Sequence, residues 1–245
     1  MNYCFQGSYT DQNKQNFQFT QEDDLQKICR YLSTDINSAS KITFKIFDSR
    51  EGKQNADPHH SISRASARFK EMTIYRFWLP TDDPHYPHEI THLVAHIWSK
   101  PYKFTTELDT WDGKNITKSI KMVSTSFMQE GLAIAIDEIV FNHPLSEEGE
   151  LNNIDDWCRQ QIDQMPKNLT AVINLDGFNS FPNKIVVPFA ASISKYLLLN
   201  FGLDKYKQMY VSLKETNKSI KNVQQIEAIY QISEKKLLNE WKEQL

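Results

Sequence analysis

The stretch that decides the fold runs Pro87-His88-Glu89-Ile90-Thr91-His92-Leu93-Val94-Ala95-His96-Ile97-Trp98. It contains an HExxH pentapeptide. Positions i and i+4 lie on one face of a helix, about 5–6 Å apart at Cβ. His88 and His92 can therefore both reach one tetrahedral Zn²⁺. Glu89 is placed to hold a proton taken from a water bound to that metal.

Two helices around this motif are expected to be buried. The first should span residues 87–100, because proline suits the first position of a helix and Pro101 ends it. The second should span residues 125–141, and both are apolar on nearly all sides, which is typical of buried helices. Ionisable residues nevertheless interrupt them: His88, Glu89, His92, His96, Glu130 and Asp137. Burying such groups is costly unless they are paired or bind metal, so the pattern favours a metal site.

Glu130 is the natural third ligand. It lies in the segment 126–133, at the start of the second helix. Two histidines and one glutamate, with water in the fourth position, form a known catalytic zinc arrangement. The sequence therefore predicts one Zn²⁺ ion held by His88, His92 and Glu130.

The motifs resemble those of a known family. His-Glu-Ile-Thr-His at 88–92 is followed thirty-eight positions after His92 by Glu130, within Gln-Glu-Gly-Leu-Ala at 129–133. This pair is similar to the gluzincin metallopeptidases, and in particular to small peptidase MA-like domains. Residues 190–202 and 232–241 resemble the later helices of that family. The resemblance covers roughly residues 40–245.

The resemblance implies a function and a role for each matching residue. His88, His92 and Glu130 would bind zinc. Glu89 would act as general base and then general acid while a metal-activated water attacks a peptide carbonyl. The substrate would be a peptide or protein.

Two departures from the family pattern affect the expected chemistry. Family members often carry an oxyanion-stabilising tyrosine before the small-residue helix, but residues 184–189 contain none. Thermolysin-like members carry an aspartate four residues after the third ligand, where this chain has Ile134, and Asp137 lies seven residues on. A lost oxyanion donor typically lowers kcat about 10²–10³-fold.

Three further residues are possible outer-shell or cleft groups. His96 lies eight residues beyond His88, which is about 12 Å of helix, so the two cannot share one metal ion. Asp137 is a candidate hydrogen-bond partner for a ligand histidine. His85 precedes the helix and could line the cleft.

The remaining pattern predicts an α+β fold in which a small, mainly antiparallel sheet packs on the HExxH helix and the C-terminal half is mostly helical. We expect residues 1–19 to form a polar N-terminal arm. We expect residues 20–245 to form a single zincin-like domain, with the sheet and the HExxH helix in 20–121 and the helical part with the third ligand in 122–245. Further expected elements are a helix over 20–33, strands over 42–47 and 72–79, loops over 49–68, 101–121 and 165–187, and helices over 151–164, 188–200, 204–214 and 222–243 with a break near Ser233.

Bulk composition narrows the function classes. The 245 residues are 40% hydrophobic with a net charge of −3, which favours a packed core over disorder. No basic cluster indicates nucleic-acid binding, and no apolar run approaches the length of a membrane span. Three widely spaced cysteines and no signal peptide favour a cytoplasmic location, or an exported one if a leader has been removed. The sequence does not reveal the oligomeric state.

We therefore expect a zinc-dependent metallopeptidase. The alternative is a non-catalytic, peptidase-like binding module that keeps only the metal site or the fold. A third class, a helical interaction protein with an accidental motif, predicts that no metal binds.

Overall fold

The structure is a computed structural model that describes residues 1–58, 63–99, 124–143 and 153–245. These residues form two compact units, the first made of the described residues up to 99 and the second of those from 124 onward. The expected α+β class is confirmed, since the first unit contains a sheet and the second is helical. That both units form one domain stays a prediction, and the expected excursion over 101–121 lies outside the described residues.

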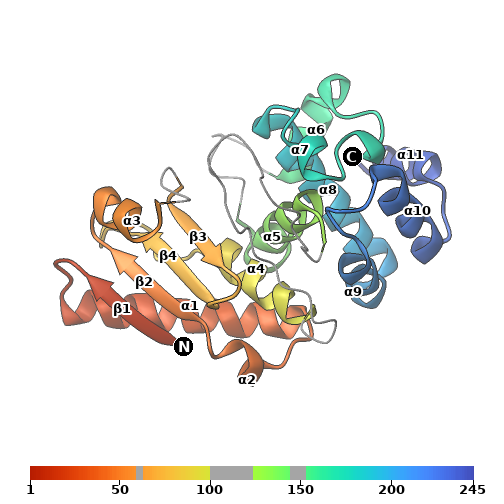
Figure 1. Cartoon of the computed structure of the whole chain (residues 1–245). Coiled ribbons are helices and arrows are strands. Elements are labelled where there is room, and N and C mark those ends of the chain that lie inside the picture. The colour runs from red at the N-terminus through yellow and green to blue at the C-terminus, as the bar shows by residue number, and fades with distance from the viewer. Residues whose placement is uncertain (59–62, 100–123, 144–152) are drawn as a thin grey trace. The chain divides into compact units, whose positions relative to one another are not determined.

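The first unit contains a four-stranded mixed sheet with the order β1-β2-β4-β3 (Figure 1). β1 pairs with β2 and β2 with β4 in parallel, and only β3 runs antiparallel to its neighbour β4. The expectation of a mainly antiparallel sheet is therefore wrong. The strands are β1 (Asn2–Gln6), β2 (Thr43–Phe47), β3 (Ala65–Arg68) and β4 (Thr73–Phe77).

Helical crossovers explain the parallel pairings, because parallel neighbours need a long connection between them. The helices α1 (Asp11–Tyr31) and α2 (Ile36–Ala39) connect β1 to β2, and α3 (Arg50–Ala56) lies between β2 and β4. The expected loop over 49–68 therefore contains a helix and a strand. Ser49 begins α3 by accepting a hydrogen bond from the backbone N–H of Gly52 at 3.1 Å.

Residues 1–19 form β1 and the first half of α1, so the expectation of a polar arm is wrong. Thr10 caps α1 with a reciprocal capping box to Asn13, so the helix begins at Asp11, nine residues before the expected start at Thr20. Phe17 is fully buried and packs edge-on against Phe44 of β2, so α1 covers one face of the sheet (Figure 1). In the sequence, the apolar residues at the start of α1 lie among many Gln and Asn residues, so the segment looks polar.

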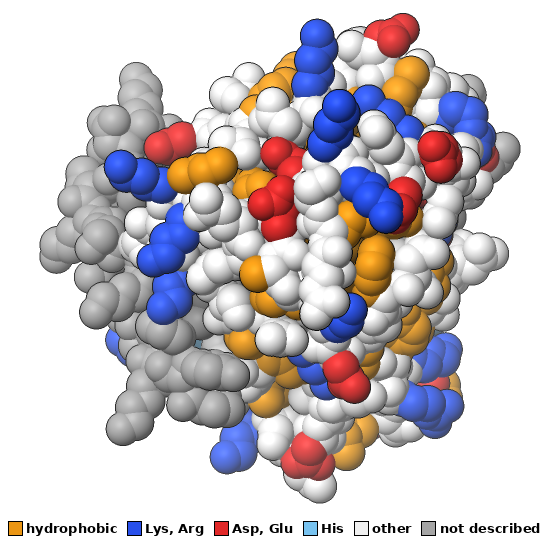
Figure 2. Space-filling model, turned by 90° about the vertical axis from the view of Figure 1, so that its right-hand side faces the viewer, with side chains coloured by type: hydrophobic (Ala, Val, Ile, Leu, Met, Phe, Trp, Pro, Cys, Tyr) orange, Lys and Arg blue, Asp and Glu red, His pale blue; other side chains and the backbone are white. Residues whose placement is uncertain are grey.

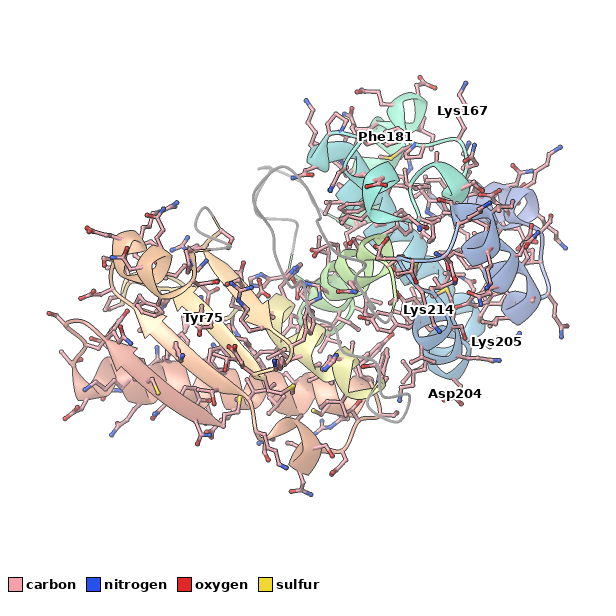
Figure 3. The ribbon with its side chains drawn as sticks, viewed as in Figure 1. Tyr75, Lys167, Phe181, Asp204, Lys205 and Lys214 are labelled. Atoms are coloured by element: carbon pink, nitrogen blue, oxygen red, sulfur yellow. The ribbon has the colours of Figure 1, made fainter. Side chains whose placement is uncertain are left out.

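The other face of the sheet carries Tyr75, which is labelled in Figure 3. Its ring stacks on Phe47, with centroids 6.4 Å apart. The Nζ of Lys45 donates a hydrogen bond to its hydroxyl at 3.0 Å. This face is therefore partly polar, in contrast to the aromatic face under α1.

Helix α4 (Pro87–Ile97) forms where the sequence predicts it, with Pro87 in its first turn. Its core side chains are fully buried: Ile90, Leu93, Val94 and Ala95. Just past its end, the indole N–H of Trp98 donates to the Thr34 hydroxyl at 2.9 Å. Both ends of the helix are thus tied to the first unit.

The second unit is a helical bundle built on the pair α5 (Ser126–Phe141) and α8 (Asn183–Phe201). The two approach closely at Gly131, where an added Cβ would lie 2.5 Å from the Ala190 carbonyl oxygen. The shorter elements are α6 (Ile154–Gln160), η3 (Ile162–Gln164), η4 (Leu169–Ala171) and α7 (Leu175–Phe178). The bundle ends with α9 (Leu203–Ser212), α10 (Ser219–Tyr230) and α11 (Glu234–Gln244).

The expected break near Ser233 is confirmed, since this residue caps α11 by accepting the backbone N–H of Lys236 at 3.3 Å. Within the part of the chain that the structure describes, α8 alone has the length and apolar composition of a membrane span. It is 67% buried over that stretch, as a core helix of a bundle would be. On the face shown in Figure 2, Lys and Arg side chains are interspersed with Asp and Glu.

The three cysteines are free and differ in exposure. Cys4 is exposed on β1, whereas Cys29 of α1 and Cys158 of α6 are buried. Burial raises the pKa of the Cys29 thiol to about 11 and also raises that of Cys158. The two buried thiols are thus poor nucleophiles at neutral pH.

Candidate metal centre

Helix α4 brings together the two histidines of the pentapeptide. The Nε2 atoms of His88 and His92 lie 3.0 Å apart, and their ring planes are nearly perpendicular. His92 is 6% exposed, and His88 is partly exposed. Two nitrogens that bind one tetrahedral zinc at about 2.0–2.1 Å lie roughly 3.3–3.4 Å from each other. The observed separation is close to that of two ligands of one ion, and it is also a hydrogen-bond distance.

Glu89 lies between these histidines in sequence and is 8% exposed. A carboxylate this deeply buried needs compensating groups. One of them is Lys53 of α3, which is 1% exposed. Burial lowers the pKa of Lys53, and the carboxylates of Asp57 and Glu89 raise it part of the way back.

Lys53 belongs to a buried polar cluster that the sequence did not predict. Its Nζ donates to the Ser63 hydroxyl at 3.0 Å and lies 3.7 Å from Asp57 Oδ2. Asp57 also accepts hydrogen bonds from Ser66 and Arg68 of β3. Burial tends to raise the pKa of Asp57, but these donors outweigh it, so the carboxyl titrates below its usual range. The cap at Ser49 was the available sequence signal for α3, and hence for this cluster.

The two other histidines near the motif have partners within the first unit. The Nδ1 of His85 lies 2.9 Å from Oδ1 of Asp24 on α1. The Nδ1 of His96 lies 3.2 Å from the Ser99 hydroxyl, and its ring packs against Phe69. His85 is thus oriented by the buried carboxylate of Asp24.

Glu130 lies in the second turn of α5 and is partly exposed. A carboxylate from the loop after α9 holds the start of this helix, since Glu215 Oε1 accepts the backbone N–H of Ser126. Its Oε2 accepts the N–H of Leu175 at 2.8 Å. Burial raises the pKa of Glu215, and these two hydrogen bonds offset part of the rise.

Neighbouring helices further define the surroundings of Glu130. The next residue, Gly131, allows the close contact with α8 described above. The pKa of Tyr210 on α9 is raised well above its usual value. Burial contributes most to this rise, followed by Tyr206 and then by the Glu130 carboxylate. The α9 helix begins near Asp204 and Lys205, which are labelled in Figure 3. Asp137 lies two turns further along α5 and is partly exposed.

His88 and His92 belong to the first unit, and Glu130 and Asp137 to the second. The role of Glu130 as third ligand, and of Asp137 as an outer-shell group, therefore remains a prediction. No family model matches the sequence, and no curated protein matches it. The likeness to gluzincins thus rests on the motif residues alone.

Proposed function

We propose that this protein is a zinc-dependent metallopeptidase. One observation carries the proposal: on the buried helix α4, the His88 and His92 Nε2 atoms lie 3.0 Å apart, and the buried Glu89 lies between the two histidines in sequence. Two convergent imidazoles and an acid in a largely apolar helix are costly to fold without a role for them.

The donor set fits zinc. His88 and His92 would each offer an imidazole nitrogen, and Glu130 would offer a carboxylate oxygen. Borderline-soft Zn²⁺ accepts this combination. When bound, the ion supplies a Lewis acid that polarises a carbonyl group and makes water more acidic.

Glu89 would move the proton. As a carboxylate, it accepts a proton from the attacking water and then delivers it to the leaving amine. The buried ammonium of Lys53 on α3 is close enough for the two charges to affect each other. We infer that this charge helps to keep Glu89 ionised between turnovers.

β4 lies between β2 and β3, so it has no free edge for an extended substrate. Among the described strands, β3 is the edge strand on that side, and it contacts α4. We propose that β3 pairs with the substrate main chain. Substitution of its side chains, such as Ala67→Val, should change peptide preference and leave zinc content unchanged. Loss of zinc would count against this assignment.

Metal analysis of protein purified without chelators tests the proposal directly. We expect one zinc ion per chain, and we expect none in the His88→Ala and His92→Ala variants. If neither substitution changes the zinc content, the proposed site is wrong. The third class, a helical interaction protein with an accidental motif, is then favoured.

Activity on a peptide library then separates an enzyme from a binding module. Glu89→Gln should retain zinc and lose activity about 10²–10⁴-fold. Glu51→Gln, which changes an exposed glutamate on α3, is the matched control. Zinc binding without any Glu89-dependent cleavage would favour the peptidase-like binding module.

A further inference from the structure

The segment 83–86 is the last part of the connection from β4 to α4, and it leads directly into the motif helix. Tyr86 is the N-cap residue of α4, and its side chain makes no capping hydrogen bond. Three side chains from elsewhere in the first unit hold this segment instead. We call them the α4 clamp: Gln21 and Asp24 of α1, and Arg76 of β4.

Two members of the clamp converge on one backbone carbonyl. The side-chain amide of Gln21 and the Nη1 of Arg76 each donate to Pro84 O at 2.6 Å. The Nη2 of Arg76 also donates to Asp83 O at 2.9 Å. Gln21 is fully buried and Arg76 is 2% exposed, so these bonds are shielded from water.

Asp24 and Arg76 hold the next two residues of the segment. Asp24 is fully buried, and its Oδ1 lies 2.9 Å from Nδ1 of His85. Burial raises the pKa of Asp24, while His85 and the backbone N–H of Tyr86 offset part of the rise. The Arg76 guanidinium lies over the Tyr86 ring, 4.7 Å from its centroid. Each residue of the segment thus contacts at least one clamp side chain.

Stability alone does not account for this arrangement. Among the residues that the structure describes, Asp24 Oδ2, Gln21 Oε1 and Arg76 Nε are buried atoms without a hydrogen-bond partner. Buried polar atoms left unsatisfied cost free energy, and well-packed apolar side chains in such places are often neutral or stabilising. A polar cluster that imposes this cost is better explained by what it positions.

We propose that the α4 clamp positions the metal centre, by fixing the start of α4 and hence the directions of His88 and His92. This inference rests on the proposed function. One residue of slip at the start of a helix turns every later side chain by about 100°. Pro87 follows the clamped segment directly, so little backbone lies between the clamp and the first ligand. Gln21, Asp24 and Arg76 are positioning residues and need not touch the metal or the substrate.

The test is metal binding by the full chain. Apoprotein is titrated with Co²⁺ alone, and its visible absorption reports the ligand geometry; zinc affinity follows by competition. Residues that orient ligands typically change metal affinity 10–100-fold when altered. We expect Asp24→Asn to weaken binding about tenfold and to change the Co²⁺ spectrum. The control is Asp23→Asn, a neighbouring residue that is paired on the surface with Lys27 at 2.6 Å.

A second variant guards against misfolding. Gln21→Met removes the amide that holds Pro84 O and keeps the size of the side chain and its helix propensity. Circular dichroism and urea unfolding report whether each variant folds. We expect Gln21→Met to unfold at nearly the wild-type urea concentration and yet to bind Co²⁺ several-fold more weakly, whereas a merely structural role would lower stability and leave the spectrum unchanged.

The outcomes separate the two proposals. If His88→Ala and His92→Ala bind Co²⁺ as the wild type does, the metal site is wrong and the clamp proposal fails with it. If both lose binding while Asp24→Asn and Gln21→Met keep wild-type affinity and spectrum, the clamp proposal is overturned and the metal site stands. Weaker binding and a changed spectrum in folded clamp variants support the inference.

Discussion

The two helices that carry the candidate ligands, α4 and α5, begin in the same way. Neither N-cap residue, Tyr86 or Thr125, supplies a side-chain capping hydrogen bond. In contrast, α1 and α11 are capped by their own Thr10 and Ser233. The candidate ligand helices depend instead on carboxylates that are distant in sequence: the buried Asp24 for α4 and the half-buried Glu215 for α5.

The carboxylates of Asp24 and Glu215 lie in different surroundings. Asp24 faces the imidazole of His85 and shares its cluster with the guanidinium of Arg76. Glu215 faces backbone N–H groups, and its own carbonyl accepts a hydrogen bond from Asn174 at 2.9 Å. The start of α4 is therefore coupled to ionisable partners, whereas the start of α5 is held by dipoles.

The largest effect is expected at the contact between α5 and α8. In Gly131→Val, the new Cβ would lie 2.5 Å from Ala190 O and from Ser194 Oγ, and the backbone carbonyl cannot move aside. We expect a loss of about 3 kcal/mol in the free energy of unfolding, measured in urea. Gly52→Ala in α3 is the control, and it should stay within about 1 kcal/mol of the wild type. Equal stability of the two variants would contradict the close contact.

A smaller loss of stability is expected when the Glu215 carboxylate, which holds the start of α5, is removed. Glu215→Ala leaves the backbone N–H groups of Ser126 and Leu175 without their acceptor. Buried donors without a partner should lower the free energy of unfolding by about 2 kcal/mol. Glu243→Ala, on the exposed face of α11, should have little effect in the same assay. An unchanged Glu215→Ala protein would show that another group holds α5.

The same carboxylate predicts a pH dependence. Because burial raises the folded-state pKa of Glu215 above its ordinary value of 4.5, the folded protein binds this proton more tightly than the unfolded chain. Its contribution to stability is thus fully present below pH 4.5 and is lost as the pH rises through the raised pKa. Glu215→Gln should flatten the curve of stability against pH in this window. A curve of unchanged slope would rule out this titration.

The smallest effect is expected at a helix that caps itself. Thr10→Ala removes the hydroxyl that accepts the N–H of Asn13 and should cost about 1 kcal/mol. Thr10→Ser keeps the hydroxyl and should recover most of that loss. Neither variant should change Co²⁺ affinity, in contrast to Asp24→Asn. A loss of affinity in Thr10→Ala would weaken the distinction between self-capped and remotely held helices.

The sequence predicted the elements whose signals are local. Helices α4 and α5 follow from their apolar stretches, with a proline at the start of α4, and the two central strands follow from their β-branched and aromatic residues. The convergence of the His88 and His92 imidazoles followed from their spacing on one helix. What these signals share is that neighbours in sequence decide the conformation.

The rest depends on contacts between distant residues. The parallel sheet was missed because the start of α1 and the whole of α3 are rich in polar residues. Phe17, Gln21, Asp24 and Ile28 follow helical spacing along one buried face of α1. The position of Asp24 on this buried face was the available sequence signal for its burial. Its partner, His85, lies sixty-one positions away, and no local pattern predicts that pairing.

The unequal burial of the three thiols gives each unit its own reporter. In the native protein, an alkylating reagent should modify Cys4 alone, because Cys29 and Cys158 are enclosed. Labelling of Cys29 requires transient opening of the first unit, and labelling of Cys158 requires opening of the second. Mass spectrometry of a labelling time course would therefore follow the opening of both units in one sample, without any added probe. A substitution such as Gly131→Val should accelerate modification at Cys158 and leave the rate at Cys29 as it was.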